Sequence, residues 1–347
     1  MHYKHSPDPT RVRVGGRGGS CPDVQPHRSR PAASWPPEIV RPLAALLATL
    51  SILLSATSVL AQPGLGSTRV ARVVGAAGLA VVDTVWSEQA GRRSTRVTAT
   101  LGSGPALELH DGTTVRTAIA ASPDALLVVA FHGGDRPFAR ALLADVRDGV
   151  LARGRTTELP IPRAAQAGAM RPSAAVATPT ASGFTVLLQE TDSQGAAAAV
   201  RTTMFVLARD GTLVSTREVS VPWALGALAW NGQGYHLAVL WGGWTAAQAG
   251  TARICLVTLS PEGAPQQHPW WATPFDAIGE MMLLPRADGA MQLVWRSGDG
   301  RTIRLQDASM VLGWGVEPPA PTELARVDPD APWAPVARGP SIALATP

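Results

Sequence analysis

The chain has 347 residues, with 30 lysine and arginine residues, 26 aspartate and glutamate residues and a formal net charge of +4. Seven of the basic and three of the acidic residues lie in the first 61 positions, which leaves 23 of each sign in residues 62–347. This larger part therefore has no net charge that would attract nucleic acid or an anionic membrane. Two cysteines, Cys21 and Cys255, exclude a disulfide-rich fold.

The N-terminal segment, residues 1–39, is rich in proline, glycine and arginine and has no apolar periodicity. This composition predicts a disordered leader. The alternative is that translation begins at Val40 and that residues 1–39 are an artefact of the gene start.

Residues 40–61 have the pattern of a secretory signal peptide. Arg41 precedes an uncharged apolar run, Leu43–Leu60, and the small residues that a signal peptidase requires end at Ala61. We therefore expect cleavage after Ala61, a secreted or periplasmic protein, and no membrane contact after cleavage. The alternative is an uncleaved anchor, because 18 apolar residues are near the lower limit for a membrane span.

From residue 69 onward, a phrase of about 50 residues recurs, in which an apolar stretch, a turn and a stronger apolar run follow one another. The first two runs can be read six times, as TRVARVV-GAAG-LAVVDTVW, VRTAIAA-SPD-ALLVVAF, SAAVATP-TASG-FTVLLQE, LGALAW-NGQG-YHLAVLW, GEMMLLP-RADG-AMQLVWR and PWAPVA-RGP-SIALATP. The second run of each phrase starts near residue 78, 124, 183, 234, 289 or 341. Short Val- and Leu-rich runs between Gly, Pro and Asp predict an all-β chain.

A third and a fourth run follow in several phrases and are joined by hairpin turns. Asp148-Gly149 and Asp210-Gly211 separate such runs, and Asp-Gly is a strong signal for a tight hairpin. Each unit therefore reads as four antiparallel strands, named A to D in chain order.

Four-stranded units repeated at this period resemble a β-propeller. The resemblance implies one domain over residues 62–347, with about six four-stranded antiparallel blades and an incomplete last blade. Five blades is the alternative count, and a pair of β-sandwiches is the alternative fold. The Trp-Asp dipeptide of WD40 repeats is absent, and the glycine pairs at 133–134 and 242–243 are only loosely kelch-like. Ser297–Thr302 is similar to the Asp-box of sialidases, with its glycine one position early.

In such blades, the B–C and D–A loops emerge on one rim, and binding residues concentrate on loops. Indoles, carboxylates and guanidinium groups on this rim would suit a glycan or a peptide. The candidate ligand-binding residues are Trp241, Trp244, His132, Asp135, Arg136, Glu190, Asp299, Trp270 and Trp271. We expect at least one of Trp241 and Trp244 to be exposed, because small residues follow them.

No nucleophile, phosphate-loop or metal-ligand motif occurs, so the sequence predicts no cofactor and no metal site. The first functional interpretation is a monomeric, non-enzymatic, exported propeller that binds a glycan or a partner protein through the rim. A second is a glycan-active hydrolase or lyase that uses His132, Asp135, Glu190 and Asp299. A third is a structural protein of the cell envelope. No nucleic-acid partner is expected.

Overall fold

A computed structural model gives the fold of the chain. It describes residues 66–89, 91–134, 136–161, 170–191, 200–221, 223–241, 253–267, 273–274, 280–286, 289–308, 320–338 and 341–346. Apart from one 3-10 turn, Gly75–Ala77, the regular elements of these residues are all β-strands. None of the described segments forms a helix of the length and hydropathy needed to cross a membrane.

Each of the first three blades is a four-stranded antiparallel sheet whose strands follow one another in chain order. Blade 1 contains β1 (Gly66–Val74), β2 (Gly78–Gln89), β3 (Arg92–Leu101) and β4 (Leu107–Thr113). Blade 2 contains β5 (Arg116–Ala121), β6 (Ala125–His132), β7 (Phe138–Arg147) and β8 (Val150–Glu158). Blade 3 contains β9 (Arg171–Thr180), β10 (Gly183–Thr191), β11 (Val200–Ala208) and β12 (Leu213–Val219).

Two more blades and a smaller sheet follow. Blade 4 contains β13 (Ala224–Trp230), β14 (Tyr235–Trp241), β15 (Arg253–Leu259) and β16 (Pro265–Gln267), and β17 (Thr273–Pro274) also pairs with β15. Blade 5 contains β18 (Met281–Pro285), β19 (Met291–Arg296), β20 (Thr302–Asp307) and β21 (Thr322–Arg326). The sixth sheet has two strands, β22 (Ala334–Arg338) and β23 (Ser341–Ala345).

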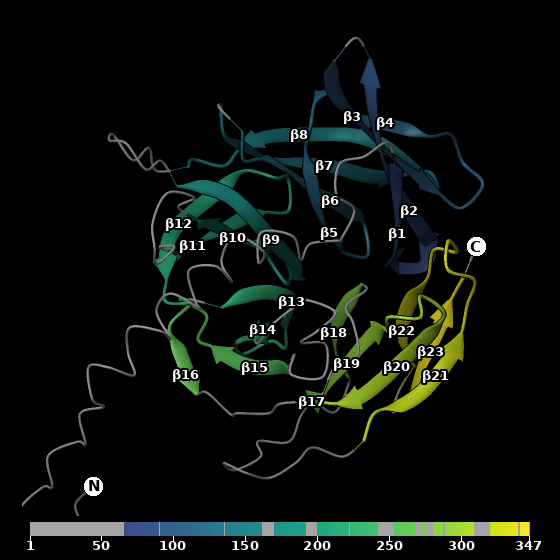
Figure 1. Ribbon diagram of the computed structural model, residues 1–347, viewed down its shortest axis with the longest axis vertical. Coiled ribbons are helices and arrows are strands. Elements are labelled where there is room, and N and C mark those ends of the chain that lie inside the picture. Colours follow the sequence, from purple (N-terminus) through teal and green to yellow (C-terminus); the bar gives the residue numbers. More distant parts are fainter. Residues whose placement is uncertain are drawn as a thin grey trace, which may run out of the picture.

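The sheets are arranged in a ring, with their first strands around a common centre (Figure 1). These inner strands contact one another in the order β1, β5, β9, β13, β18 and β22, and β22 returns to β1. The predicted all-β propeller is thus confirmed, and the alternative of paired sandwiches is wrong. The described residues form five complete blades, which agrees with the alternative count, and a sixth sheet of two strands.

Differences in burial explain why the second and fourth strands of a blade have different patterns of apolar residues in the sequence. The second strands of blades 2 and 3 lie between neighbouring blades, so both faces are covered and a run such as β10 is buried from Gly183 to Glu190. The outermost strand β12 alternates between exposed and half-buried residues, because one face meets solvent. A continuous apolar run therefore marks a B strand that is covered on both faces, whereas β2, which lines the lateral groove, alternates between buried and more exposed residues.

Five apolar layers lie between successive sheets and make up the core. The layer between blades 3 and 4 includes Leu187, Met204 and Leu237, and the layer between blades 4 and 5 includes Met291 and Trp295. The last layer joins blade 5 to the sixth sheet through Val294, Trp333 and Ile342. None of the five layers joins the sixth sheet to blade 1, and among the described residues this junction is polar and hollow.

Two turns show why the chain needs glycine where it does. In the β7–β8 hairpin, Asp148 and Gly149 have φ angles of 52° and 76°, which is the geometry that favours Asp-Gly. Gly183 begins β10 with φ at 152°, and a Cβ atom there would lie 2.1 Å from the carbonyl oxygen of Leu207. Only glycine allows β11 to approach the start of β10 so closely.

Candidate active site

Three of the hollows among the described residues lie at the centre of the ring or beside blade 1. The channel, of about 310 Å³, is enclosed by the inner strands and is lined mostly by small residues of β5, β9 and β13. The cleft, of about 650 Å³, lies between blade 1 and the segment Pro329–Ala331. The lateral groove, of about 1030 Å³, lies between blade 1 and blade 5 at the outer side of the sixth sheet.

Glu280 stands where the channel and the cleft meet, because its side chain lines both. It immediately precedes β18, the inner strand of blade 5. Its Oε1 accepts a hydrogen bond of 2.6 Å from Nη1 of Arg72 on β1, so this pair joins blades 5 and 1 across the ring. The two side chains are 17% and 20% exposed. An ionisable pair thus lies at the inner end of an open hollow.

Burial raises the pKa of Glu280 above its ordinary value, because the carboxylate loses hydration. The positive charges of Arg72 and Arg296 lower it in part, but burial has the larger effect. A carboxyl group with these surroundings holds its proton at higher pH than an exposed glutamate. When it loses the proton, the positive charges of Arg72 and Arg296 stabilise the carboxylate.

Arg296, the last residue of β19, holds the wall of the cleft in place. Its Nη1 donates to the carbonyl oxygens of Gly300, Asp328 and Pro329, and its Nη2 donates to that of Ala331 at 2.7 Å. Its guanidinium also lies 5.9 Å from the ring centre of Trp333. Burial lowers the pKa of Arg296, and the charges of Glu280 and Asp330 oppose that effect. These hydrogen bonds of Arg296, called the clamp below, hold the segment Pro329–Ala331, which places Asp330 in the lining of the cleft.

Asp83 on β2 is a further carboxylate of the cleft. Nε of Arg69 donates to its Oδ1 at 2.5 Å, and Nη2 donates to its Oδ2 at 3.4 Å. Both carboxylate oxygens are thus engaged by one guanidinium. The hydrogen bond and the charge of Asp83 in turn raise the pKa of Arg69.

The sequence-predicted residue His132 ends β6. Its Nδ1 donates to the carbonyl oxygen of Thr114 at 2.6 Å, and its ring stacks on Phe138 with 5.7 Å between ring centres. Arg136 is exposed in the following loop. Neither residue lines the channel, the cleft or the lateral groove.

Glu190, another predicted site residue, is fully buried at the end of β10. Its Oε2 accepts bonds of 3.0 and 2.8 Å from Nε and Nη2 of Arg201 on β11. Burial raises its pKa, although Arg201 acts in the opposite direction. This arrangement places the carboxylate inside blade 3, away from the three hollows.

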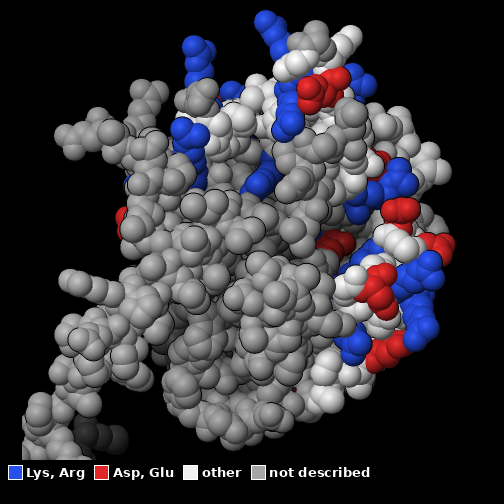
Figure 2. All heavy atoms as spheres, in the orientation of Figure 1, with Lys and Arg blue, Asp and Glu red and all other residues white. Residues whose placement is uncertain are grey.

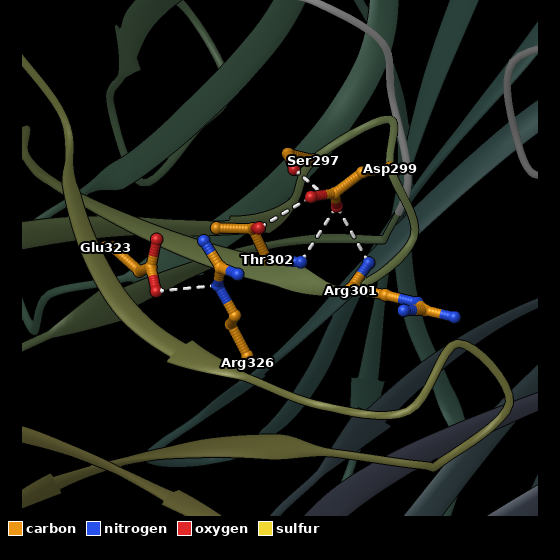
Figure 3. A network of polar contacts seen from close by, with 6 residues as sticks. All are labelled: Ser297, Asp299, Arg301, Thr302, Glu323 and Arg326. Atoms are coloured by element: carbon orange, nitrogen blue, oxygen red, sulfur yellow. Dashed lines mark hydrogen bonds and ion pairs between the residues drawn. The ribbon is translucent and has the colours of Figure 1, made fainter.

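Asp299 organises the turn between β19 and β20 (Figure 3). Its Oδ1 accepts bonds from Oγ of Ser297 and from the backbone N–H groups of Arg301 and Thr302, each at 2.8 Å. Its Oδ2 accepts a bond of 2.6 Å from Oγ1 of Thr302. These donors hold the pKa of Asp299 far below its ordinary value. The Asp-box-like motif therefore has a structural function, and it forms one wall of the lateral groove.

The other predicted site residues are not placed by the described part of the chain. Asp135, Trp244, Trp270 and Trp271 lie outside the described residues, and Trp241 is described only as the last backbone position of β14. Their roles in ligand binding stay predictions. Within the described ranges, no three His, Cys, Asp or Glu side chains form a group suited to a metal ion.

Sequence reasoning missed Glu280, although a signal for it exists. Of the six repeated phrases, the first run carries an acidic residue only in GEMMLLP, which contains Glu280. The other five runs are neutral or contain arginine. An acidic residue next to an inner strand is costly to bury unless it is paired, and such residues are often found at functional sites. Glu280 could therefore have been identified as a candidate site residue from the repeat alone.

No family model and no curated protein matches the chain. Among solved structures, the fold is similar to an α-L-arabinanase of Penicillium chrysogenum, at 12% identity and a TM-score of 0.44 over 78% of this chain and 84% of that one. A GH43 β-xylosidase/α-arabinofuranosidase from a compost microbial metagenome is 12% identical, with a TM-score of 0.41 over 67% and 84% of the two chains. A neuraminidase-like protein from a bat isolate is 11% identical, with a TM-score of 0.43 over 78% and 80%.

These findings correct the first functional interpretation of the sequence, a non-enzymatic propeller that binds its ligand at the rim. Two of the similar structures are named as glycoside-cleaving enzymes. Such low identity shows a shared fold and assigns no activity. The activity has to be argued from the site itself.

Proposed function

We propose that the protein is a glycan-active hydrolase in which Glu280 donates a proton to the leaving sugar oxygen. The observation that carries this proposal is the position of Glu280 at the junction of the cleft and the channel, paired with Arg72 and facing an open hollow. Hydrolysis of a glycosidic bond requires a carboxylic acid beside the bridging oxygen and a second carboxylate close by.

The surroundings of Glu280 suit a general acid. Burial raises its pKa, so a larger share of the group is protonated near neutral pH than in an exposed glutamate. When the proton passes to the leaving oxygen, Arg72 and Arg296 stabilise the carboxylate that remains. The charges of Arg72 and Arg296 thus favour the carboxylate form of Glu280 over its protonated form.

The second carboxylate in this proposal is Asp330, which lines the same cleft on the segment held by Arg296. A carboxylate in this role activates a water molecule or attacks the anomeric carbon. Asp83 also lines the cleft, but both of its oxygens accept bonds from Arg69. Asp83 is therefore assigned to holding Arg69 and shaping the wall.

The test is hydrolysis of soluble xylan, arabinan, mixed-linkage glucan and a sialylated glycoprotein, measured as released sugar. We expect Glu280→Gln to lower kcat/KM on the hydrolysed polymer by about 10²–10⁴-fold, because the variant keeps the shape and loses the proton. Asp330→Asn should lower it to a similar extent, since the cleft would retain only one acting carboxyl group.

Glu158→Gln is the matched control, because Glu158 lies on β8 with 63% exposure and pairs with Arg140 on the surface. It should keep the wild-type rate. Melting temperatures of all variants show whether the fold is retained. Hydrolysis that survives Glu280→Gln, or a wild-type protein that releases sugar from none of the four polymers, would overturn the proposal.

Export is part of this proposal, because polysaccharides such as xylan and arabinan occur outside the cytoplasm. It is supported by the signal-peptide pattern that ends at Ala61. N-terminal sequencing of the protein recovered from the periplasm or the medium should begin at Gln62. A product that retains Leu43–Leu60 in the membrane fraction would contradict it.

A further inference from the structure

The junction between the sixth sheet and blade 1 differs from every other junction in the ring. Each of the other five is filled by an apolar layer. At this one, none of the described apolar layers is present, and the lateral groove lies between blade 1 and blade 5. The groove has about three times the volume of the channel. Among the described residues, this junction is therefore the open one.

We infer that the lateral groove binds the sugar units of a neutral polysaccharide beyond the bond that is cleaved, so that a polymer enters through the side of the propeller. This inference rests on the proposed function, since it assigns the reacting bond to the cleft beside Glu280. It adds the substrate class, a neutral polymer, and a second binding region that extends away from the reacting bond.

Continuity of the hollows is the first support. The lateral groove and the cleft share Arg69, Asp83 and Ala331 as lining residues. The cleft and the channel share Val70 and Glu280. One elongated ligand can therefore lie along the groove and the cleft and reach Glu280 at the inner end.

The charge of the groove is the second support. Its ionisable lining residues are three arginines and three aspartates, Arg69, Arg301, Arg326, Asp83, Asp299 and Asp328. Basic and acidic side chains alternate along this side of the molecule, near the position of β21–β23 and β1 (Figure 2). The formal charges cancel, so the groove has no net field that would select an acidic or a basic polymer. Guanidinium groups donate to sugar hydroxyls and carboxylates accept from them, which suits a neutral glycan.

The wall of the groove is held in place before any ligand binds. Asp299 accepts bonds of 2.8 Å from the backbone N–H groups of Arg301 and Thr302 and a bond of 2.6 Å from the hydroxyl of Thr302 (Figure 3). On the neighbouring strand, Nε of Arg326 donates to Glu323 at 3.1 Å. A polar surface that is already ordered loses less conformational entropy on binding, and this increases the affinity for each sugar unit.

The test measures binding to Glu280→Gln, which should bind substrate without cleaving it. Xylo- and arabino-oligosaccharides of two and of six units are titrated by calorimetry, with polygalacturonate as the acidic polymer. We expect Kd to fall by about tenfold or more from two to six units of the preferred sugar. In Arg301→Ala/Arg326→Ala the shorter ligand should keep its Kd, and the gain with length should shrink to about twofold.

The matched control is Arg147→Ala/Arg155→Ala, because these two exposed arginines pair with carboxylates, Asp145 on blade 2 and Asp210 on blade 3, and do not line the groove. It should leave the length dependence intact. Equal Kd values for two and six units, preference for polygalacturonate, or no binding to any of these ligands would overturn the inference.

The same data separate this inference from the proposed function. If wild-type protein binds longer oligosaccharides more tightly but never cleaves them, the proposed function fails and the groove stands. If the protein cleaves them with a kcat/KM that is independent of length, the groove assignment fails and the hydrolase stands.

Discussion

The closed junction between blades 3 and 4 and the open junction between the sixth sheet and blade 1 are built on different principles. The first is filled by side chains such as Leu187, Met204 and Leu237, of which none is exposed. Beside the second lie two polar pairs: Arg69 with Asp83, which is within blade 1, and Arg72 with Glu280, which joins blade 1 to blade 5. Burial of apolar surface therefore holds five sixths of the ring, and charged groups are free to line a hollow at the remaining position.

The comparison also shows why the candidate site lies where it does. A carboxyl group placed within an apolar layer would lose its hydration without gaining partners, at a cost of several kcal/mol. At the open junction, Glu280 keeps a cation at 2.6 Å and access to the cleft. The open junction thus supplies the environment in which an acid can be partly buried and still reach a ligand.

Leu187→Ala should give the largest loss of stability, because it leaves a cavity in a closed layer. We expect a decrease of roughly 2–5 kcal/mol in the free energy of unfolding. Val81→Ala, on the wall of the lateral groove, should cost about 1 kcal/mol or less, since this side chain already meets a hollow. Urea unfolding of both variants measures the contrast, and equal losses would show that the two junctions are packed alike.

Arg296→Gln should have an intermediate effect, because it removes the clamp at the open junction. The four carbonyl groups that accept from the guanidinium lose a charged donor, for which we expect roughly 1–3 kcal/mol of destabilisation. The pKa of Glu280 should rise further, since the charge of Arg296 lowers it. Urea unfolding and the pH profile of hydrolysis measure the two effects.

Arg326→Gln serves as the comparison for this variant, because Arg326 is 75% exposed and its ion pair is on the surface. It should change the free energy of unfolding by under about 1 kcal/mol. If both variants lost the same free energy of unfolding, the hydrogen bonds of Arg296 would stabilise the fold no more than an ordinary surface arginine does.

The smallest expected effect is on the pH dependence of stability. In the folded protein, burial raises the pKa of Glu280 above the ordinary value of 4.5, so the folded state holds this proton more tightly than the unfolded state. The resulting stabilisation is present in full below pH 4.5 and is lost as the pH rises through the raised pKa.

Glu280→Gln has no group to titrate at this position, so the difference in unfolding free energy between wild type and variant should change over that range of pH and then level off. Unfolding in urea at a series of pH values from acidic to neutral measures it. A difference that is independent of pH would show that Glu280 titrates normally in the folded protein.

Much of the fold could be predicted from local sequence. The second runs were expected to start near residues 78, 124, 183, 234, 289 and 341, and the corresponding strands begin at Gly78, Ala125, Gly183, Tyr235, Met291 and Ser341. Apolar runs and Gly- or Asp-containing turns are short-range features, so each hairpin is specified by its own residues.

The candidate site could be predicted far less well. Asp299 and Glu190 were expected on a binding rim, but one holds a turn and the other lies inside a blade with Arg201. A charged side chain near a strand end has the same sequence pattern whether it faces a partner strand, its own turn or solvent. The choice among these depends on which strand lies beside it.

The sequence by itself determined the strands, the hairpins and the repeat, because each of these depends on neighbours within a few residues or on the periodic recurrence of the phrase. Only the tertiary structure placed Glu280 beside Arg72, 208 positions away, and opened the cleft between them and Asp330. The physical reason is ring closure: β22 returns to β1, so the hollow between blades 1 and 5 is bounded by segments far apart in the sequence and by no local segment.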